Sequence, residues 1–524
     1  MHIMFVASEV APYSKTGGLA DVCGALPKEL AKLGCKTSIV TPLYKCARDY
    51  FQHSTDRLNT TFETLSIPIG PEVKRAGVQT AKIKTSGEDV DVYFIEHEDY
   101  FGRDGIYNYQ GVDYSDNCER FAFFSRAAFE LIRSLRLEVD VLHANDWQTG
   151  LVPVYLDALY RSTSRVGASG FLEPAPRPRV NFGDSSNLFD RIQSVITIHN
   201  LRHQGRFWRD AMELTGLDWS LFTYDKMEFY GQLNLLKAGV VFSDAITTVS
   251  PQYAKEIQTE AYGERLQGVL QSRANDLYGI LNGIDVDEWD PEKDSYLPAN
   301  FNSKNFKVGK AKCKESLQRE ANLPVDPDVP LLGFVSRLDP QKGLDLVADL
   351  VPTLVEEQNI QLVALGSGDR TLAERFNLLK RRYPRNVAVF NGFSVELSHR
   401  IEAGIDIFLM PSRFEPCGLN QMYSLRYGSL PIVRDVGGLH DTVVNASDEN
   451  IANGTANGFL FYWSEAEDMK KAVDWALHCY RDRKKDWYNM MRAAMSSDLS
   501  WTNSARQYKA LYEKLVARRS DERF

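Results

Sequence analysis

Apolar residues at the start of the chain form first a short continuous run and then a helical repeat. His2 to Ala7 is an apolar run of strand length, and leucine and valine then recur every three or four residues from Leu19 to Leu33. This spacing predicts an amphipathic helix that ends at Gly34. A second strand, Thr37 to Thr41, follows at once and is closed by Pro42. Together the three segments predict a βαβ unit of a largely parallel sheet.

The same alternation begins again in the second half of the chain. An apolar strand from Leu331 to Val335 leads through a polar turn, Ser336 to Gly343, into a helix whose inward positions start at Leu344. Three later strands are expected at Leu362 to Leu365, Ile405 to Met410 and Leu430 to Val433. The fold class is therefore α/β, with two doubly wound domains of the Rossmann type.

The domain boundary is expected near Asp276, which gives domains of 1–275 and 276–501. The segment from Arg161 to Asp190 is rich in Ser, Gly, Pro and Arg and poor in apolar residues. That composition predicts a flexible insertion rather than regular structure.

Composition narrows the possible partners and location. With 524 residues, 44% hydrophobic and 25% charged, the chain suits two large globular domains, and no apolar run is long enough to cross a bilayer. The net charge of -9 argues against binding to nucleic acid or anionic lipid. Seven scattered cysteines and the lack of a signal-peptide pattern favour a reducing compartment, the cytoplasm.

Two glycine-bearing turns follow apolar runs in the two halves and predict phosphate binding. Lys15-Thr16-Gly17-Gly18-Leu19 follows the first strand, and Arg413-Phe414-Glu415-Pro416-Cys417-Gly418-Leu419 follows a strand almost four hundred residues later. Glycine lets backbone N–H groups approach an anion closely, and each turn leads into the positive end of a helix. We therefore expect a phosphate-bearing ligand in a cleft between the domains.

Cations at the same sheet edges support this interpretation. Arg337 and Lys342 stand five residues apart on the turn between strand and helix, and Lys15 would meet them from the other domain. Basic pairs are common on solvated surfaces, but the position of this pair at a strand end favours a diphosphate site.

Three other side chains at strand ends are candidates for chemistry. The Glu415 carboxylate could accept hydrogen bonds from sugar hydroxyls or stabilise positive charge at an anomeric carbon, or it could simply complement a helix dipole. Asp146 and His199 each follow an apolar strand, and each could equally be a structural hydrogen-bonding residue. No nucleophilic role for Glu415 can be inferred, because the distance to a partner carboxylate is not known from sequence.

Metal and aromatic motifs carry less weight. His199 and His203 have the spacing of two zinc ligands on a helix but lie in a strand-to-loop stretch, so a zinc site is not expected. Asp285-Val286-Asp287 resembles the acidic signature of metal-dependent sugar transferases, yet it is interpreted as a loop. The aromatic segment Tyr93 to Tyr114 either supplies a platform for sugar rings or packs against itself.

Read in order, these motifs resemble those of bacterial glycogen synthases and plant starch synthases over nearly the whole chain. The motifs that carry the resemblance are Lys15 to Leu19, His143 to Trp147, Ile198 to Asn200, Leu281 to Asp285, Ser336 to Leu338 and Arg413 to Leu419. The resemblance implies a GT-B arrangement of two Rossmann-like domains facing a central cleft that closes on the donor. It also implies that residues 502–524 return as a helix to the first domain.

The resemblance further implies an activity and assigns roles to residues. The activity would be the retaining transfer of glucose from ADP-glucose to the nonreducing end of an α-1,4-glucan, with no cofactor and no essential metal. Lys15, Arg337 and Lys342 would bind the diphosphate with help from the backbone at Gly18, Gly418 and Leu419. Glu415, Asp146, His199 and Asn282 would hold the glucosyl group, and Phe393 and Cys417 would line the nucleotide and sugar site.

Other functions remain open at this point. A related transferase could use UDP-glucose or a small acceptor such as a sugar phosphate. A catalytically silent glucan-binding paralogue could also keep the fold, although the joint presence of Lys15, Arg337, Lys342 and Glu415 argues against it. If a transit peptide was trimmed from the sequence, the expected location would be the plastid stroma instead of the cytoplasm.

Overall fold

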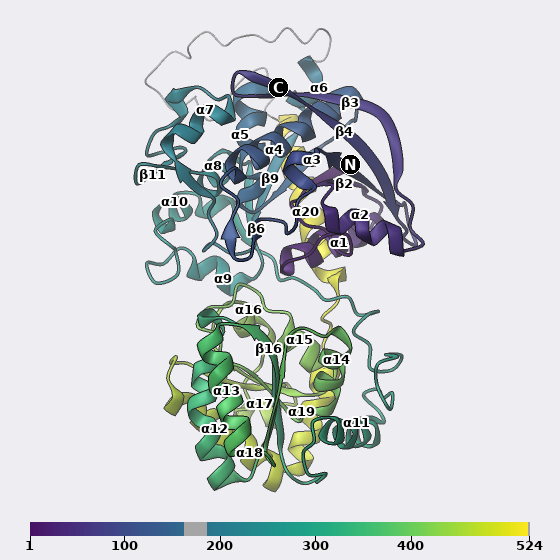
Figure 1. Cartoon of the computed structure of the whole chain (residues 1–524), viewed down its shortest axis with the longest axis vertical. Coiled ribbons are helices and arrows are strands. Elements are labelled where there is room, and N and C mark those ends of the chain that lie inside the picture. The colour runs from purple at the N-terminus through teal and green to yellow at the C-terminus, as the bar shows by residue number, and fades with distance from the viewer. Residues whose placement is uncertain (162–185, 522–524) are drawn as a thin grey trace. The chain divides into compact units, whose positions relative to one another are not determined.

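The computed structural model describes residues 1–161 and 186–521, and these form two compact units. The first unit comprises Met1–Val249, Ala254–Ile280 and Trp501–Phe524, and the second comprises Ser250–Tyr253 and Leu281–Ser500. Both are drawn in Figure 1. No helix in the described residues is both long and apolar enough to span a membrane.

The first unit is built on a sheet of nine strands in the order β14-β13-β9-β8-β1-β2-β5-β4-β3. Its strands are β1 (His2–Val6), β2 (Lys36–Pro42), β3 (Asn59–Ile69), β4 (Glu72–Ile83), β5 (Val90–Glu96), β8 (Val141–Asn145), β9 (Gln193–Ile198), β13 (Ala245–Thr248) and β14 (Leu277–Gly279). All neighbours pair in parallel except β3 with β4 and β4 with β5. The predicted parallel sheet is therefore confirmed.

Helices and small hairpins complete this unit. The helices are α1 (Gly18–Lys32), α2 (Lys45–His53), α3 (Glu98–Phe101), α4 (Asn117–Ser134), α5 (Leu151–Tyr155), α6 (Ser186–Asp190), α7 (Met212–Thr215), α8 (Leu235–Phe242), α10 (Gln267–Ser272) and α20 (Trp501–Asp521). The short strands are β6 (Asn108–Tyr109), β7 (Val112–Asp113), β10 (Arg206–Trp208), β11 (Glu228–Phe229) and β12 (Gln232–Asn234). Helix α9 (Pro251–Glu256) spans the point where the chain passes between the units.

Helix α20 shows how the end of the chain is anchored in the first unit. Its apolar face, which includes Trp501, Tyr508 and Tyr512, packs in one core with Leu26 and Leu30 of α1. Figure 1 shows α20 in yellow beside the purple α1. The expected returning helix is thus present as Trp501–Asp521, and residues 522–524 lie outside the described residues.

The second unit has a six-stranded parallel sheet in the order β17-β16-β15-β18-β19-β20. Its strands are β15 (Leu331–Leu338), β16 (Gln361–Gly368), β17 (Val387–Asn391), β18 (Ile407–Met410), β19 (Leu430–Arg434) and β20 (Phe459–Phe461). Its helices are α11 (Phe306–Glu320), α12 (Leu344–Gln358), α13 (Arg370–Arg382), α14 (Val395–Gly404), α15 (Asn420–Arg426), α16 (Gly437–Thr442), α17 (Asp448–Ala452), α18 (Ala466–Asp482) and α19 (Lys484–Ser496). Figure 1 shows α12 and α13 on one face of this sheet and α11, α14 and α15 on the other.

Several bounds differ from the apolar runs that predicted them. The change of unit falls after Ile280, close to the expected position near Asp276, because β14 pairs with β13 and extends the first sheet. Strand β15 runs to Leu338, so Arg337 lies within the strand and pairs with Ser367. Strand β18 begins at Ile407, two positions later than the apolar run suggested.

The predicted flexible insertion from Arg161 to Asp190 falls largely on residues 162–185, which lie outside the described residues. Its two ends are ordered. Arg161 is buried and its guanidinium donates to the Asp244 carboxylate at 2.7 Å. At the other end, α6 brings the Phe189 ring to 5.0 Å from that of Tyr160.

Both sheets reverse their strand order at the strand that precedes a predicted phosphate motif. In the first unit, β1 lies between β8 and β2, and in the second unit β15 lies between β16 and β18. Ligands of doubly wound sheets bind outside the carboxyl ends of the strands at such switch points. The loops after β1 and β15 therefore mark one candidate half-site in each unit.

Candidate active site

The half-site of the first unit is organised by the buried carboxylate of Glu9, just after β1. It accepts hydrogen bonds from the backbone N–H and the hydroxyl of Thr16, the latter at 2.7 Å, and from the N–H of Gly17 at 3.3 Å. The Tyr107 hydroxyl donates to the same carboxylate at 2.5 Å. These bonds fix the loop that carries Lys15 and place Gly18 as the first residue of α1.

Lys15 forms only a weak, exposed ion pair at the amino end of α1. Its ammonium lies 2.7 Å from the Asp21 carboxylate on the first turn of the helix, and its side chain is 52% exposed. Ion pairs with this exposure contribute little to stability, typically below about 1 kcal/mol. The ammonium can therefore turn to an arriving anion at small cost, close to the positive end of the helix.

Asp146 and His199 meet at the ends of the adjacent strands β8 and β9. The Asp146 carboxylate accepts the backbone N–H of His199 at 2.7 Å and that of Asn200. Burial raises the pKa of Asp146 to about 7, against the opposing effect of these two bonds. Asp146 also has a φ of 56°, a strained value for a non-glycine residue and one that is common at functional sites.

His199 is a neutral imidazole. Burial lowers its pKa to about 3, and its Nε2 lies 2.9 Å from the side-chain oxygen of Asn145. With Nε2–H donating to that oxygen, Nδ1 is the ring's acceptor nitrogen. The structure thus brings together the two residues that were predicted only singly at strand ends. The Glu9 carboxylate is close enough to raise the pKa of Asp146, so both loops belong to one half-site.

The centre of the half-site in the second unit is an ion pair between Lys342 and Glu415. The Lys342 ammonium lies 2.6 Å from Oε2 of Glu415, and the Ser412 hydroxyl donates to the same oxygen at 2.9 Å. Both side chains are largely buried. Oε1 of Glu415 makes no hydrogen bond within the described residues, so it remains available to a ligand.

Backbone contacts hold the two loops of this pair together. The N–H of Arg413 donates to the carbonyl of Gln341 at 2.8 Å, and the Gln341 side chain donates to the carbonyl of Phe414 at 3.1 Å. Lys342 and Glu415, which are far apart in sequence, are therefore positioned by neighbouring strands, β15 and β18.

Glycine at the start of α16 allows the Glu415 turn to pack closely. A Cβ on Gly437 would lie 2.0 Å from the carbonyl oxygen of Glu415, and one on Gly438 would lie 2.1 Å from that of Cys417. The Gly438 N–H donates to the Glu415 carbonyl at 3.1 Å. Gly418 has a φ of +73°, which turns the chain into α15. The turn and the two following helix ends thus form one rigid unit.

Asn282 and Cys417 also belong to this half-site. The Asn282 backbone hydrogen-bonds the Cys417 thiol, whose pKa is raised to about 12 by burial, so Cys417 stays protonated and lines the site rather than acting as a nucleophile. The side-chain oxygen of Asn282 is buried and has no hydrogen-bond partner among the described residues. Such an acceptor is costly unless a ligand completes it.

Arg337, Leu419 and Phe393 occupy the surroundings of the ion pair. Arg337 is exposed at the end of β15, and its guanidinium makes no ion pair with a described residue. Leu419 is the capping residue of α15. Phe393 is 81% exposed after β17, two strands from β15, and contacts between it and the ion pair are not observed in the described residues.

The remaining motifs of the sequence have structural roles. The Asp285 carboxylate accepts the N–H groups of Asp287 and Glu288, which confirms that this acidic triplet forms a turn. No group of three potential metal ligands occurs in the described residues. In the aromatic segment, Tyr100 and Phe101 are buried, so much of this segment packs against itself.

Sequence reasoning missed Glu9, Tyr107 and Ser412. The position of Glu9 could have identified it, because a carboxylate shortly after a buried strand at a switch point usually has a functional or structural role. Tyr107 carried none of that kind, since its contact with Glu9 spans ninety-eight positions of sequence.

Comparison with known proteins assigns the family. Residues 2–169 and 180–272 match the starch synthase catalytic domain, and residues 317–492 match the glycosyl transferases group 1. The chain is 47% identical to a glycogen synthase of Anaeromyxobacter sp. (strain Fw109-5) over 99% of its length and 100% of the relative's. It is 42% identical to a glycogen synthase of Thermotoga maritima, with 99% of each chain covered.

Solved structures give the same result. The catalytic domain of starch synthase IV from Arabidopsis thaliana, bound to ADP and acarbose, superposes with a TM-score of 0.84 at 32% identity, covering 98% of this chain and 99% of that one. Sucrose-phosphate synthase from Thermosynechococcus elongatus has a TM-score of 0.56 at 17% identity over 98% and 99% of the two chains, which shows a shared fold only. The chain therefore belongs to the glycogen and starch synthase family of glycosyltransferases, with the GT-B fold.

Proposed function

We propose that this protein transfers glucose from ADP-glucose to the nonreducing end of an α-1,4-glucan with retention of configuration. The observation that carries the proposal is the buried pair of Lys342 and Glu415 in the same half-site as Asn282, whose side-chain oxygen is unpartnered among the described residues and whose backbone hydrogen-bonds Cys417. A cation, a carboxylate and an amide acceptor at one switch point suit a ligand that has both phosphate and sugar hydroxyls. The family membership and the nucleotide-bound starch synthase support this choice.

Each half-site supplies its own groups to a diphosphate. Lys15 and the N–H of Gly18 act from the first, and Arg337, Lys342 and the backbone at Gly418 and Leu419 act from the second. These side chains and N–H groups donate charge-assisted hydrogen bonds to the phosphate oxygens, and the proposed reaction uses no cofactor and no essential metal. Glu415 fixes the ammonium of Lys342 through Oε2 and can accept a sugar hydroxyl through Oε1.

The remaining polar groups act on the glucosyl unit. Neutral His199 accepts a hydroxyl at Nδ1, Asn282 accepts one at its side-chain oxygen, and ionised Asp146 stabilises the positive charge that develops near the anomeric carbon. Phe393, on its exposed loop, stacks on the base. In the transfer step the bond from the anomeric carbon to the phosphate oxygen breaks, and a bond to the acceptor oxygen forms on the same face. The acceptor proton passes to the leaving phosphate, which departs as ADP.

Elongation of defined malto-oligosaccharides with ADP-glucose and UDP-glucose side by side tests the proposal. We expect products one glucose longer and stoichiometric ADP release, with ADP-glucose preferred. Addition of EDTA should leave the rate unchanged. A preference for UDP-glucose would show that the proposed donor is wrong. Transfer only to a sugar phosphate would show that the proposed acceptor is wrong. Glucan binding without ADP release would indicate a silent paralogue. Location in the cytoplasm stays a prediction.

A further inference from the structure

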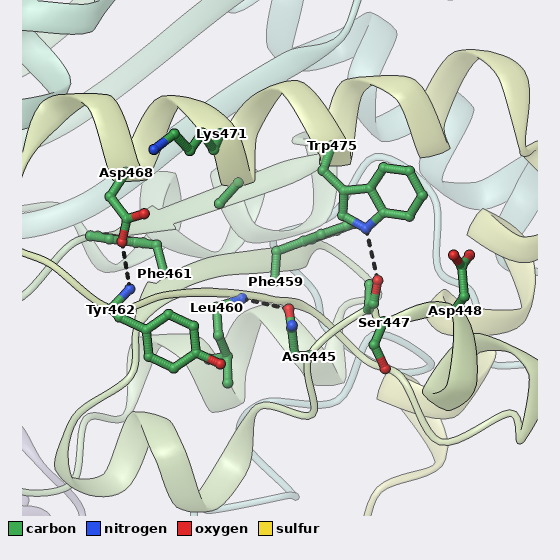
Figure 2. Close-up of a pocket in the computed structure, with 12 residues that line it drawn as sticks. Asn445, Ser447, Asp448, Phe459, Leu460, Phe461, Tyr462, Asp468, Lys471 and Trp475 are labelled. Carbon is green, nitrogen blue, oxygen red and sulfur yellow. Dashed lines mark hydrogen bonds between the residues drawn. The ribbon is translucent and has the colours of Figure 1, made fainter.

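A second pocket lies in the second unit, at the edge strand β20. Its volume is about 370 Å³, and it is an open pocket lined by residues of β20, of α18 and of the loop before α17. Its walls include Asn445, Ser447, Leu460, Tyr462, Asp468 and Trp475. Figure 2 shows the rings of Tyr462 and Trp475 on either side of Leu460 and Asn445. It shares no lining residue with the half-site of Lys342 and Glu415.

The aromatic side chains of this pocket are presented on a fixed frame. The Trp475 indole N–H donates to the carbonyl of Ala446 at 2.7 Å, which fixes the orientation of its ring. The backbone N–H groups of Tyr462 and Trp463 both donate to Oδ2 of Asp468, at 2.8 and 2.9 Å. Tyr462, which lines the pocket, is nevertheless 58% exposed, and the neighbouring Trp463, which lies just outside the lining, is 70% exposed. Adjacent exposed aromatic rings on a rigid turn are typical of a binding surface.

The charges around the pocket are offset, which favours a neutral ligand. Asp468 is satisfied by the two backbone N–H groups, and Lys471 lies 3.4 Å from Glu467. Asp448 lies 2.6 Å from Arg483. An anion or a cation would therefore meet no unpaired opposite charge in this group of residues. The side-chain amide of Asn445 and the hydroxyls of Ser447 and Tyr462 offer hydrogen bonds to a neutral polar ligand.

The edge of β20 is poorly suited to a peptide strand. The N–H of Leu460 already donates to the side-chain oxygen of Asn445 at 3.0 Å, and that of Tyr462 donates to Asp468 at 2.8 Å. Strand addition needs free backbone groups along the edge. Side chains already satisfy these two, so an added peptide would have to break existing bonds.

We propose that this pocket is a second α-glucan subsite, which binds the polymer apart from the position of transfer. A glucan chain is neutral, carries hydroxyls along its rim and presents apolar sugar faces to aromatic rings, which matches the pocket in each respect. The inference rests on the proposed function, because the polymer that is elongated is also the ligand. A polymer held at two places dissociates more slowly than one held at a single place.

Affinity electrophoresis of the full chain in gels that contain glycogen, without donor, tests the subsite. Tyr462→Ala is the main variant, because its exposed side chain can be removed without a cavity. Trp475→Tyr keeps a ring but alters the platform. Tyr296→Ala is the control, since Tyr296 is a partly exposed aromatic of the same unit outside the pocket. We expect about fivefold weaker glycogen affinity for Tyr462→Ala, the order expected for one lost ring contact. The control variant should bind glycogen as tightly as the wild type.

Kinetics separate the subsite from the site of transfer. In Tyr462→Ala, KM for glycogen should rise about as much as the binding constant, while KM for ADP-glucose and kcat with maltotriose stay unchanged. Unaltered glycogen affinity, or an equal loss with maltotriose, would overturn the inference. A change of oligomeric state in Tyr462→Ala would also overturn it, by assigning the pocket to a protein partner. If the wild-type chain binds glycogen through Tyr462 but releases no ADP, the proposed function fails and the subsite stands.

Discussion

At the scale of single residues, the most influential side chain is one that touches no ligand in our account. The Glu9 carboxylate receives four hydrogen bonds from the Lys15 loop and Tyr107, so it positions Lys15 rather than contacting the donor. An amide in place of the carboxylate would put an NH2 group where Oε1 accepts the Thr16 and Tyr107 hydroxyls, so both hydroxyls would have to rotate and accept instead of donate.

Glu9→Gln should therefore disturb the Lys15 loop while leaving the fold intact. We expect kcat to fall by about tenfold or more, corresponding to one misplaced charged contact, with an unchanged circular dichroism spectrum. Steady-state ADP release is the measurement. Glu29→Gln is the control, because Glu29 forms only an exposed pair with Lys32 on the same helix. Equal rates for Glu9→Gln and the wild type would remove Glu9 from the site.

Asp146 should make activity depend on pH near neutrality. Its pKa is raised to about 7 by burial, so it loses its negative charge as the pH falls through that value. We expect kcat/KM for the donor to fall about tenfold per pH unit below pH 7, as for a single required ionisation. Asp146→Asn should be slow and should lack this limb. The same limb in the variant would show that another group titrates.

At the scale of elements, the close packing of α16 on the Glu415 turn is the most sensitive feature. Gly437 has a φ of +45°, and a Cβ there would lie 2.0 Å from the carbonyl oxygen of Glu415. Gly454 has a similar positive φ of +70°, but its Cβ would meet nothing within 4 Å. An alanine at Gly454 would therefore add backbone strain alone, whereas an alanine at Gly437 would add backbone strain and a clash with the Glu415 turn.

Gly437→Ala should lower both stability and turnover, whereas Gly454→Ala should lower stability alone. Backbone strain costs about 1 kcal/mol at either position, and the clash at Gly437 adds about 1–3 kcal/mol or moves the Glu415 turn. Thermal unfolding and ADP release measure the two effects. Normal turnover in Gly437→Ala would mean that the turn can shift without harm to the reaction.

Element prediction from sequence worked where apolar periodicity was strong and failed where pairing was distant. The helix after Lys15 was expected from Leu19 to Leu33 and spans Gly18–Lys32. Strand β15 was expected to end at Val335, yet its polar end, which includes Arg337, still pairs with β16. Polar residues can continue a ladder without burial, so hydrophobicity marks the core of a strand and not its end.

At the scale of the whole molecule, the chain's end stabilises the unit in which the chain begins. His143 of β8 is 1% exposed, and its two ring nitrogens lie 2.7 Å from the Tyr512 hydroxyl of α20 and 2.6 Å from that of Thr197. Burial lowers the pKa of His143 from its ordinary 6.5 to about 3. Protonation of His143 should therefore weaken the packing of α20 against the first unit and make its stability depend on pH.

The sign of the pH effect follows from the lowered pKa. The folded unit keeps His143 neutral, while the unfolded chain binds a proton below pH 6.5, so the stability is present above 6.5 and is lost as the pH falls toward 3. Between pH 7 and pH 5 the loss should be about 2 kcal/mol. Denaturant unfolding of the wild type and His143→Gln at both pH values isolates it. An equal slope in the two proteins would contradict this assignment.

The sequence allowed the residues of the candidate site to be predicted, but not which of them lie next to one another in the fold. Lys15, Arg337, Lys342 and Glu415 could be found from charge beside glycine at strand ends. The link from Lys342 to Glu415 and the burial of Asn282 depend on which strands are neighbours, which local sequence does not specify. The domain boundary was expected near Asp276 and the units divide after Ile280, because the three-residue strand β14 is defined by its pairing with β13 and belongs to the first sheet.

The most direct test of the central claim is a crystal structure of the protein with bound ADP. We expect diphosphate oxygens within about 3 Å of the Lys15 and Lys342 ammonium groups and the Arg337 guanidinium, the normal length of charge-assisted hydrogen bonds. A diphosphate bound elsewhere, with these three side chains facing solvent, would contradict it.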